Sequence, residues 1–582
     1  MLPRQSLRQH LPAVAEVLAI LGIALVPRVI GTDHPPYIDE LYNVLAARSL
    51  VSEGTLEIGQ AMPYRRGLLH TLIVAGMFRL FGTGLEAARL PGIVFGTALV
   101  GLVFVWVRSV AGRLEAWIAA LLLAFYPAAI ALSQIGRFYP AQVLLFWIGA
   151  LAVYRSFLVG RDPGSAHVDR VERSADFDVP EPGAAVVGER RSPFPDTAGK
   201  RHAALPGLVV AAIAFATALH FQRVTVIGIG GVIAAVVILR GGDAVRWAGA
   251  RRIPLRAIAA AAVVAIAGAI VAAPVVARAW RLFNQGDLWA HEHWHNPIFY
   301  HERFLELYGP LWLLLPVLLI VAIRKRPAAA ILATAIFALA FGFHSLAMWK
   351  NERYIHYAMP AFFILVGIGS GALVRSARAA ALPAAKSHRQ ARLRAFAFWS
   401  GTIAAAAAVL SFGSAPGTVL RMATLDAPDR PQPYPPSDWE AARPHLRPAL
   451  DRARDVIASA DLKALFFLGR LDYDLLADHL YDRVRFLPDF TPQRATGIPA
   501  IRSADAVQRI VDCVPTGLIA IEQDHWRTVD GVPAETADRI ESIARPIAVP
   551  ASTRILAFEW GDAVSGGEAA PVSPACSALP AR

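Results

Sequence analysis

An acidic pair, Asp39-Glu40, stands at a junction between extended chain and helix. The preceding His34-Pro35-Pro36 excludes helix, because proline restricts its own backbone and that of the residue before it. The run from Leu41 to Leu50 has a helical pattern, so both carboxylates stand near a helix N-terminus, where the macrodipole favours negative charge. Such a pair serves either as a helix cap or as a general base that removes a proton from a hydroxyl group.

Cationic and aromatic residues recur in four short stretches between the apolar runs. The candidate binding residues among them are Tyr64, Arg65, Arg66, Arg137, Tyr139, Arg223, Lys350, Arg353 and Tyr354. A guanidinium group binds phosphate oxygens in bidentate fashion, so fixed cations beside a bilayer suit a phosphate that is anchored by a lipid tail. Taken singly, each residue is better explained as an anchor at the membrane interface. Their convergence with a carboxylate favours a group-transfer site.

The composition shows that membrane helices must position these residues. The chain has 582 residues, of which 55% are hydrophobic and 18% charged, and its mean hydropathy is +0.44. This is too apolar for a protein whose whole surface is solvated. The net charge of +12 does not indicate nucleic-acid binding, because the arginines gather in short loops between apolar stretches, as the positive-inside rule describes.

Eleven apolar runs are long enough to cross a hydrocarbon core of about 30 Å. They lie near 11–30, 91–108, 114–132, 138–159, 205–219, 224–239, 255–276, 308–323, 328–347, 354–374 and 395–414. A further run, Gly67 to Phe81, contains His70 and Arg79 and is short, which favours an interfacial segment. If this run does not cross, every strongly basic loop falls on the cytoplasmic side. The four candidate stretches and the C-terminal region then share the outer side.

The sequence divides into a membrane module and an exported domain. The expected parts are a membrane module (1–415) with a first outer loop (31–90) and a disordered cytoplasmic loop (160–204), a linker (416–436), a periplasmic α/β domain (437–565) and a disordered tail (566–582). The fold class is therefore a polytopic α-helical membrane protein of about eleven transmembrane helices with a C-terminal periplasmic α/β domain.

Within the C-terminal domain, helices and strands are expected to alternate. The patterns predict helices at 438–459 and 504–511 and strands at 464–468, 518–521 and 555–560. Cys513 and Cys576, the two cysteines of the chain, both fall in this exported region. Two readings stay open for them, a disulfide or a pair of free thiols.

The order of several motifs resembles that of the GT-C superfamily of membrane glycosyltransferases. The motifs are Asp39-Glu40 after the first helix, an amphipathic segment ending in Phe81-Gly82, Ala88-Arg89-Leu90-Pro91, Gly136-Arg137-Phe138-Tyr139, Arg353-Tyr354 and Pro360. The similarity is closest to the branch that contains protein O-mannosyltransferases and lipid A aminoarabinose transferases. It covers roughly the first 375 residues and implies the GT-C fold, with juxtamembrane helices in the first outer loop.

The resemblance implies an inverting transfer of a sugar from a polyprenyl-phosphate donor of the undecaprenyl type to a hydroxyl of a lipid, glycan or protein. The reaction is expected on the periplasmic face of a bacterial inner membrane. The family's essential acidic residue maps onto Asp39, with Glu40 beside it, and its phosphate-contacting basic residue onto Arg65 or Arg66. This chain lacks the family's Lys-Pro-Pro there and has Gln134, Ile135 and Gly136, rather than an acidic residue, immediately before Arg137.

Two details of the transferase hypothesis and one rival function stay open. A divalent cation, Mg²⁺ or Mn²⁺, could assist the reaction, although the sequence specifies no metal site. The histidines of 291–295 could ligate a metal, or this loop could form a lid. The chain could instead be a transporter or flippase of lipids or glycans, but such a protein should carry its ionisable residues near the middle of the spans.

Overall fold

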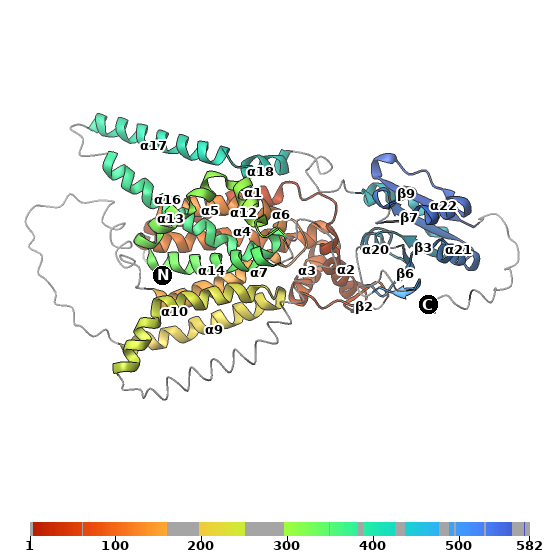
Figure 1. Ribbon diagram of the computed structural model, residues 1–582, viewed down its shortest axis with the longest axis horizontal. Coiled ribbons are helices and arrows are strands. Elements are labelled where there is room, and N and C mark those ends of the chain that lie inside the picture. Colours follow the sequence, from red (N-terminus) through yellow and green to blue (C-terminus); the bar gives the residue numbers. More distant parts are fainter. Residues whose placement is uncertain are drawn as a thin grey trace, which may run out of the picture.

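The computed structural model describes residues 4–60, 62–159, 197–250, 296–347, 350–381, 388–424, 437–475, 488–493, 496–528, 531–561 and 576. Three layers follow one another along its long axis: a helical bundle, a layer of short helices, and an α/β domain (Figure 1). The predicted span at 255–276 and the loop 291–295 lie outside the described residues, as do most of the predicted cytoplasmic loop, linker and tail.

The bundle contains the long apolar helices of the chain. Its elements are α1 (Arg4–Val29), α4 (Leu85–Val110), α5 (Arg113–Ala124), α6 (Pro127–Ser133), α7 (Tyr139–Val153), η1 (Tyr154–Leu158), α9 (Thr197–Phe221), α10 (Thr225–Ala250), α12 (Phe299–Tyr308), α13 (Pro310–Lys325), α14 (Pro327–Leu346), α15 (Glu352–Ile355), η4 (His356–Ala358), α16 (Met359–Ala381), α17 (His388–Ser411) and α18 (Ala415–Thr424). Pro127, Pro310 and Pro327 begin helices, where the missing N–H of proline costs nothing.

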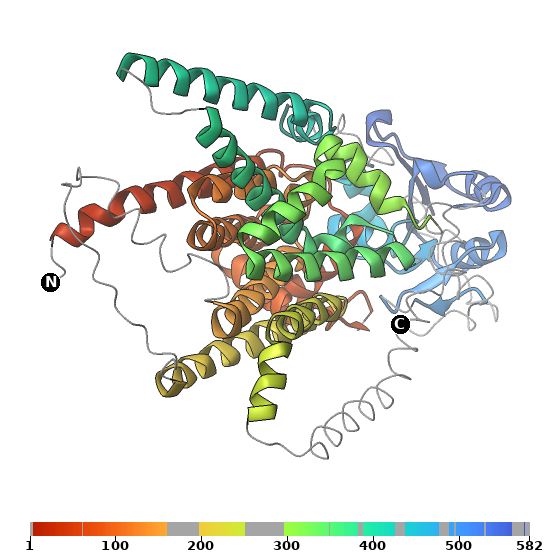
Figure 2. The same cartoon turned by 60° about the vertical axis from the view of Figure 1, so that its left-hand side comes forward.

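Six described helices are long and apolar enough to cross a membrane, and two bent pairs raise the number to eight. The bends are 60° between α5 and α6 and 98° between α12 and α13. Two further predicted spans correspond to the shorter apolar segments Leu205–Phe221 and Thr225–Gly241. The polytopic helical class is confirmed, and each predicted crossing within the described residues coincides with helix. Helix α17 lies along the outside of the bundle, and no residue of its apolar window is buried (Figures 1 and 2).

The break between α5 and α6 has a specific polar cap. The side chain of Arg28, at the end of α1, donates to the carbonyl oxygens of Ala24 (2.7 Å) and Ala124 (3.1 Å). Ala124 is the last residue of α5, whose terminal carbonyls lack partners in their own helix. Arg28 therefore stabilises a helix terminus inside the bundle.

The two ends of the bundle differ in their ion pairs. Helix α4 begins near Arg89 and ends near Arg108, so these arginines lie at opposite ends of a 26-residue helix. Arg108 and Arg113 pair with Glu16. Arg89, in contrast, pairs with Glu40 in the layer of short helices. The predicted basic loop at 108–113 thus lies at the bundle end far from the C-terminal domain (Figure 1).

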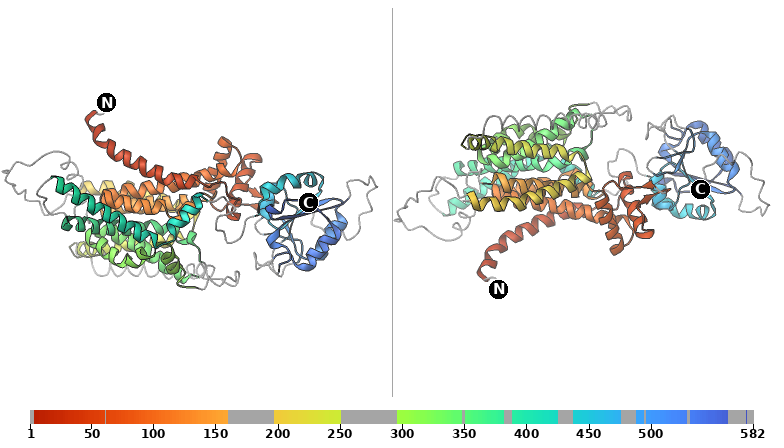
Figure 3. Two further views of the ribbon diagram at one scale, coloured as in Figure 1. Left: turned by 90° about the horizontal axis from the view of Figure 1, so that it is seen from above. Right: turned by 90° about the horizontal axis from the view of Figure 1, so that it is seen from below.

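The layer of short helices consists of α2 (Ile38–Ser52), α3 (Leu68–Phe81) and a hairpin, β1 (Glu57–Ile58) and β2 (Met62–Pro63). It lies between the bundle and the C-terminal domain (Figures 1 and 3). With 14 residues, α3 is shorter than the roughly 20 residues that a span needs. Its place and length agree with the prediction that Gly67 to Phe81 does not cross.

The C-terminal domain is a three-layer mixed α/β structure. Its seven strands, in spatial order, are β5 (Thr491–Pro492), β6 (Pro499–Ile501), β4 (Tyr473–Leu475), β3 (Asp455–Ala458), β7 (Gly517–Glu522), β9 (Ile555–Trp560) and β8 (Arg545–Pro546). The strands from β6 to β7 are parallel, and both edges are antiparallel. The helices α19 (Trp439–Arg452) and α20 (Asp461–Leu468) cover one face, and α21 (Ala504–Cys513) and α22 (Ala534–Ile543) cover the other.

The predicted strand at 464–468 is wrong, because this apolar run forms most of α20. A short run that is buried on most sides has no periodicity to separate strand from helix. The predicted helix at 438–459 ends early, and its last residues form β3. The strands at 518–521 and 555–560 and the helix at 504–511 are confirmed. Cys513 and Cys576 form a disulfide, with their Cα atoms 5.4 Å apart.

Candidate active site

Asp39 forms an ion pair with Arg353, a residue 314 positions later in the chain. Asp39 lies in the first turn of α2, at the bundle side of the layer of short helices. Arg353 lies in the first turn of α15, which begins where the Asn351 side chain accepts a hydrogen bond from the Arg353 backbone N–H (3.0 Å). About a quarter of each side chain is exposed, so the pair remains accessible to a ligand.

Arg137 is buried behind this pair and is fixed by two hydrogen bonds. Its guanidinium donates to the side-chain oxygen of Asn43 (2.7 Å) and to the hydroxyl of Tyr64 (2.8 Å). Asn43 in turn donates to the hydroxyl of Thr71 on α3 (2.8 Å). The Nε atom of Arg137 has no hydrogen-bond partner among the described residues. Arg137 therefore has a fixed orientation and spare capacity to donate.

Arg66 supplies a third positive charge near Asp39. Its side chain is exposed and makes a 3.4 Å contact with the side-chain oxygen of Gln222, between α9 and α10. The loop that carries it packs against Phe138 at Gly67, whose φ of +67° and close approach to that ring exclude a side chain. Three guanidinium groups from three chain segments thus face one carboxylate.

The electrostatic environment keeps Asp39 ionised. Burial raises the pKa of its carboxyl group. The charges of Arg137, Arg353 and Arg66 together lower this pKa by more than burial raises it, so it lies below its ordinary value. Three cations against one carboxylate leave an excess of two positive charges. Such an excess can accommodate a phosphate group, whose negative charge the arginines would share with Asp39.

Glu40 was predicted as a second catalytic carboxylate, but the structure gives it a different environment. Its side chain is fully buried and receives two hydrogen bonds from Arg89, at 2.6 and 3.2 Å. The backbone N–H groups of Tyr37 and Gly136 also donate to it, at 2.8 and 2.7 Å. With both oxygens occupied and no access to solvent, Glu40 cannot reach a substrate hydroxyl. Instead it holds the backbone next to Arg137 in place.

Lys350 also differs from its prediction as a phosphate ligand. Its ammonium group donates to the carbonyl oxygens of His344 (2.9 Å), Ser345 (2.5 Å) and Ala347. These are the terminal carbonyls of α14, so the lysine caps a helix end. Arg65 and Arg223 are exposed and belong to the loops that carry Arg66 and Gln222. No interaction of their side chains with Asp39 is resolved among the described residues.

Tyrosines surround the ion pair. Tyr354 accepts a 3.4 Å contact from Arg353, whose guanidinium lies 5.2 Å from the centre of its ring. Tyr139 is buried and lies within electrostatic reach of Arg353 and Arg137. Tyr64 stacks on Tyr42 at a centroid distance of 5.3 Å. The predicted tyrosines therefore gather around Arg353 and Arg137.

Sequence reasoning missed Asn43, Arg89 and Gln222 as members of this network. Asn43 stands one helical turn after Asp39 and so lies on the same side of α2. Arg89 occurs at the start of an apolar span, where a buried charge requires a partner. Both signals were present in the sequence. The contact of Gln222 with Arg66 depends on the packing of distant helices and has no local signal.

The described residues contain no group of three or more His, Cys, Asp or Glu side chains that could hold a metal ion. The carboxylate beside Asp39 is committed to Arg89, and Asp39 itself is paired with arginine. This donor set does not fit a divalent cation, so no step is assigned to one.

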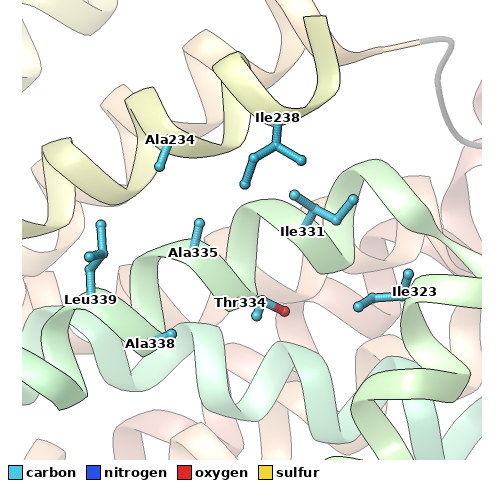
Figure 4. A pocket seen from close by; sticks show the side chains of 8 residues that line it. All are labelled: Ala234, Ile238, Ile323, Ile331, Thr334, Ala335, Ala338 and Leu339. Atoms are coloured by element: carbon cyan, nitrogen blue, oxygen red, sulfur yellow. The ribbon is translucent and has the colours of Figure 1, made fainter. Parts of the chain in front are cut away.

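A separate cavity of about 410 Å³ lies between α10, α13 and α14 (Figure 4). Its lining is apolar apart from Thr334 and includes Ile238, Ile323 and Leu339. Ile238 lies about 24 Å along the helix axis from Gln222, at 1.5 Å per residue. Because Ile238 and Leu339 are exposed, the cavity opens on the apolar flank of the bundle and is separate from the Asp39 site.

No protein-family model and no curated protein matches this sequence. Solved structures do match its fold. ArnT from Cupriavidus metallidurans in the apo state has a TM-score of 0.56 and 13% identity, covering 95% of this chain and 98% of that protein. ArnT bound to undecaprenyl phosphate has a TM-score of 0.55 and 16% identity, covering 96% and 99%.

The archaeal oligosaccharyltransferase AglB from Archaeoglobus fulgidus, in complex with an inhibitory peptide and a dolichol-phosphate, has a TM-score of 0.51 and 12% identity. The match covers 87% of this chain and 69% of AglB. At these identities the likeness concerns the fold. The chain is structurally similar over nearly its full length to ArnT and AglB, which are GT-C membrane glycosyltransferases, and this confirms the fold that the motif order predicted.

Proposed function

We propose that the protein is an inverting glycosyltransferase that moves a sugar from a polyprenyl-phosphate donor to a hydroxyl group of a cell-envelope acceptor. The observation that carries this proposal is the meeting of Asp39 with Arg353, Arg137 and Arg66 at one accessible site. The fold supports it, because ArnT has been solved with undecaprenyl phosphate and AglB with a dolichol-phosphate. Both ligands are lipid phosphates of the proposed donor class.

The arginines are proposed to bind the donor phosphate. In the donor this phosphate is a diester with one negative charge, and in the leaving group it is a monoester with up to two. The excess of two positive charges at the site therefore suits the leaving group better than the donor. Arg353, Arg137 and Arg66 would stabilise the charge that develops as the bond between sugar and phosphate breaks.

Asp39 is proposed as the base. The acceptor oxygen attacks the anomeric carbon from the face opposite the phosphate, the bond from that carbon to the phosphate oxygen breaks, and the hydroxyl proton passes to Asp39. The arginines lower the pKa of Asp39 in the free protein. A bound phosphate opposes their field, so donor binding should raise this pKa and make Asp39 a stronger base when it is needed.

The site is proposed to face the periplasm of a bacterial inner membrane. Helix α2, which carries Asp39, and the C-terminal domain lie at the same end of the bundle (Figure 1), and the domain contains the Cys513–Cys576 disulfide. Disulfides persist in oxidising compartments such as the periplasm. The basic loop at 108–113 lies at the opposite end, as the positive-inside rule requires.

Transfer of radiolabelled sugar would test the function. The purified protein in liposomes would be mixed with undecaprenyl-phosphate-linked sugars and with extracts of envelope lipids, glycans and proteins as acceptors. We expect label in an acceptor fraction, with release of undecaprenyl phosphate. If the donor crosses the bilayer without any transfer of label, the protein is a flippase and the transferase proposal is wrong.

A further inference from the structure

The helix that carries Asp39 has a second face, which packs against the C-terminal domain. Leu41 and Leu45 of α2 are buried in one hydrophobic cluster with residues of α19 and α20. The opposite face carries Asp39 and Asn43, the residues that contact Arg353 and Arg137. The position of Asp39 is therefore coupled to the docking of a domain whose described residues contribute nothing to the site.

A polar contact fixes this docking. The guanidinium of Arg48 donates to the carbonyl oxygen of Phe466 (3.1 Å) and lies 4.4 Å from the centre of its ring. Phe466 is in the last turn of α20, where helix carbonyls lack partners and a positive charge is favourable. Arg48 thus caps a helix of the C-terminal domain from the helix that bears Asp39.

A second contact joins the domain to the β1–β2 hairpin. The backbone N–H of Gln60 donates to the carbonyl oxygen of Thr496 (2.8 Å). Gly59 and Gly497 flank this bond, both with positive φ, and a Cβ at either would lie 2.6–2.7 Å from a backbone oxygen of the other segment. This approach requires glycine on both sides. The hairpin leads directly to Tyr64 and Arg66.

We infer that the C-terminal domain is a positioning element for the active site, acting through two separate contacts. Arg48 sets the position of α2 and so of Asp39, and the Gly59–Gly497 contact sets the hairpin and so Tyr64 and Arg66. This inference rests on the proposed function. It assigns the domain an effect on catalysis, although none of its described residues contacts Asp39 or the three arginines.

The two contacts have different kinetic signatures. Arg48→Ala should lower kcat about tenfold and leave the donor KM unchanged, because displacing a reacting group by a fraction of an ångström slows chemistry rather than binding. Arg48→Lys retains a donor for the Phe466 carbonyl and should recover most of the rate. Gly59→Ala should raise the donor KM, because it displaces the residues that contact the phosphate.

Matched controls separate this role from general damage. Gly54→Ala introduces an alanine at a similar positive φ in the same outer loop, but nothing lies within 4 Å of the added Cβ. Arg527→Ala removes an arginine that pairs with Asp538 and Glu541 on α22, on the far face of the sheet. Both controls should retain the kinetic constants of the wild-type protein.

Thermal unfolding with and without undecaprenyl phosphate gives a readout that needs no transfer. The lipid should stabilise the wild-type, Arg48→Ala and Gly54→Ala proteins, and should stabilise Gly59→Ala markedly less. If Arg48→Ala and Gly59→Ala match their controls in both assays, the positioning role is wrong, and wild-type transfer would leave the proposed function intact. If the wild-type protein binds the lipid but transfers nothing, the proposed function is wrong. The comparison of lipid stabilisation between Gly59→Ala and Gly54→Ala then tests the role of the hairpin contact by itself.

Discussion

Asp39 and Glu40 are neighbours on α2, yet they occupy opposite electrostatic environments. Glu40 has no exposure and accepts four hydrogen bonds, two of them from a single arginine, Arg89. Asp39 is partly exposed, has one direct partner in Arg353, and faces two more arginines. The first carboxylate is neutralised and satisfied. The second stands in a region of excess positive charge that a ligand can enter.

This difference separates a structural ion pair from a candidate catalytic one. A fully buried pair has its desolvation offset only by its own hydrogen bonds, so its members cannot leave one another. A partly exposed pair can exchange partners with a phosphate or a hydroxyl group. The residue type alone does not distinguish the two carboxylates, whereas the number of partners and the access to solvent do.

Replacing Asp39 by Asn gives the strongest test of the difference between Asp39 and Glu40. We expect turnover to fall roughly a hundredfold or more, because the amide cannot accept the hydroxyl proton. Thermal stability should change little, since Asp39 is partly exposed and ion-paired at one point. Single-turnover transfer assays and unfolding curves would measure both quantities. Wild-type turnover in Asp39→Asn would remove this residue from the mechanism.

Glu40→Gln should show the reverse pattern. The change leaves Arg89 buried with a neutral partner, and breaking a buried ion pair costs about 3–5 kcal/mol. We expect a large drop in Tm and in yield, while the folded fraction keeps much of its turnover. Activity would be normalised to folded protein by size-exclusion chromatography. A stable Glu40→Gln protein without activity would show that Glu40 takes part in catalysis.

Arg353→Lys should have an intermediate effect. Lysine keeps the positive charge but loses the planar fork that binds phosphate oxygens in bidentate fashion, so donor KM should rise about tenfold. Lys350→Ala is the matched control from the same segment, because its ammonium group caps α14 and should leave donor KM unchanged. Donor titrations of both variants would show whether the site discriminates between these two cations. Equal changes of donor KM in the two variants would contradict the assignment of Arg353 as a phosphate ligand.

Asp461 offers a third type of carboxylate, buried and without an ion-pair partner among the described residues, and the smallest expected effect. Burial raises its pKa from 3.8 to about 6, with a hydrogen bond from the Leu462 N–H acting in the opposite direction. A raised carboxyl pKa destabilises the folded state once the group ionises, by up to about 3 kcal/mol. Asp461→Asn should therefore raise Tm above pH 6, and the gain should vanish as pH falls towards 4. A gain that is independent of pH would show that charge is not its cause.

Much of the fold follows from local sequence patterns. Runs of apolar residues specify membrane helices, because unpaired backbone groups are too costly in lipid for any other local structure. The short length and the charges of Gly67 to Phe81 predicted a segment that does not span, and its helix α3 has only 14 residues. Alternating patterns located β7 and β9, but the uniformly apolar run at 464–468 lacked any period and was assigned to the wrong structure.

The sequence alone determined which residues could take part in chemistry, since a carboxylate at a helix start and arginines in short loops are local facts. Only the tertiary structure decided between them. In it Asp39 contacts Arg353, 314 positions later in the chain, Glu40 is buried against Arg89, and Lys350 caps the end of a helix. The reason is physical: the role of a charge depends on its solvation and its partners, and both are set by how distant segments pack.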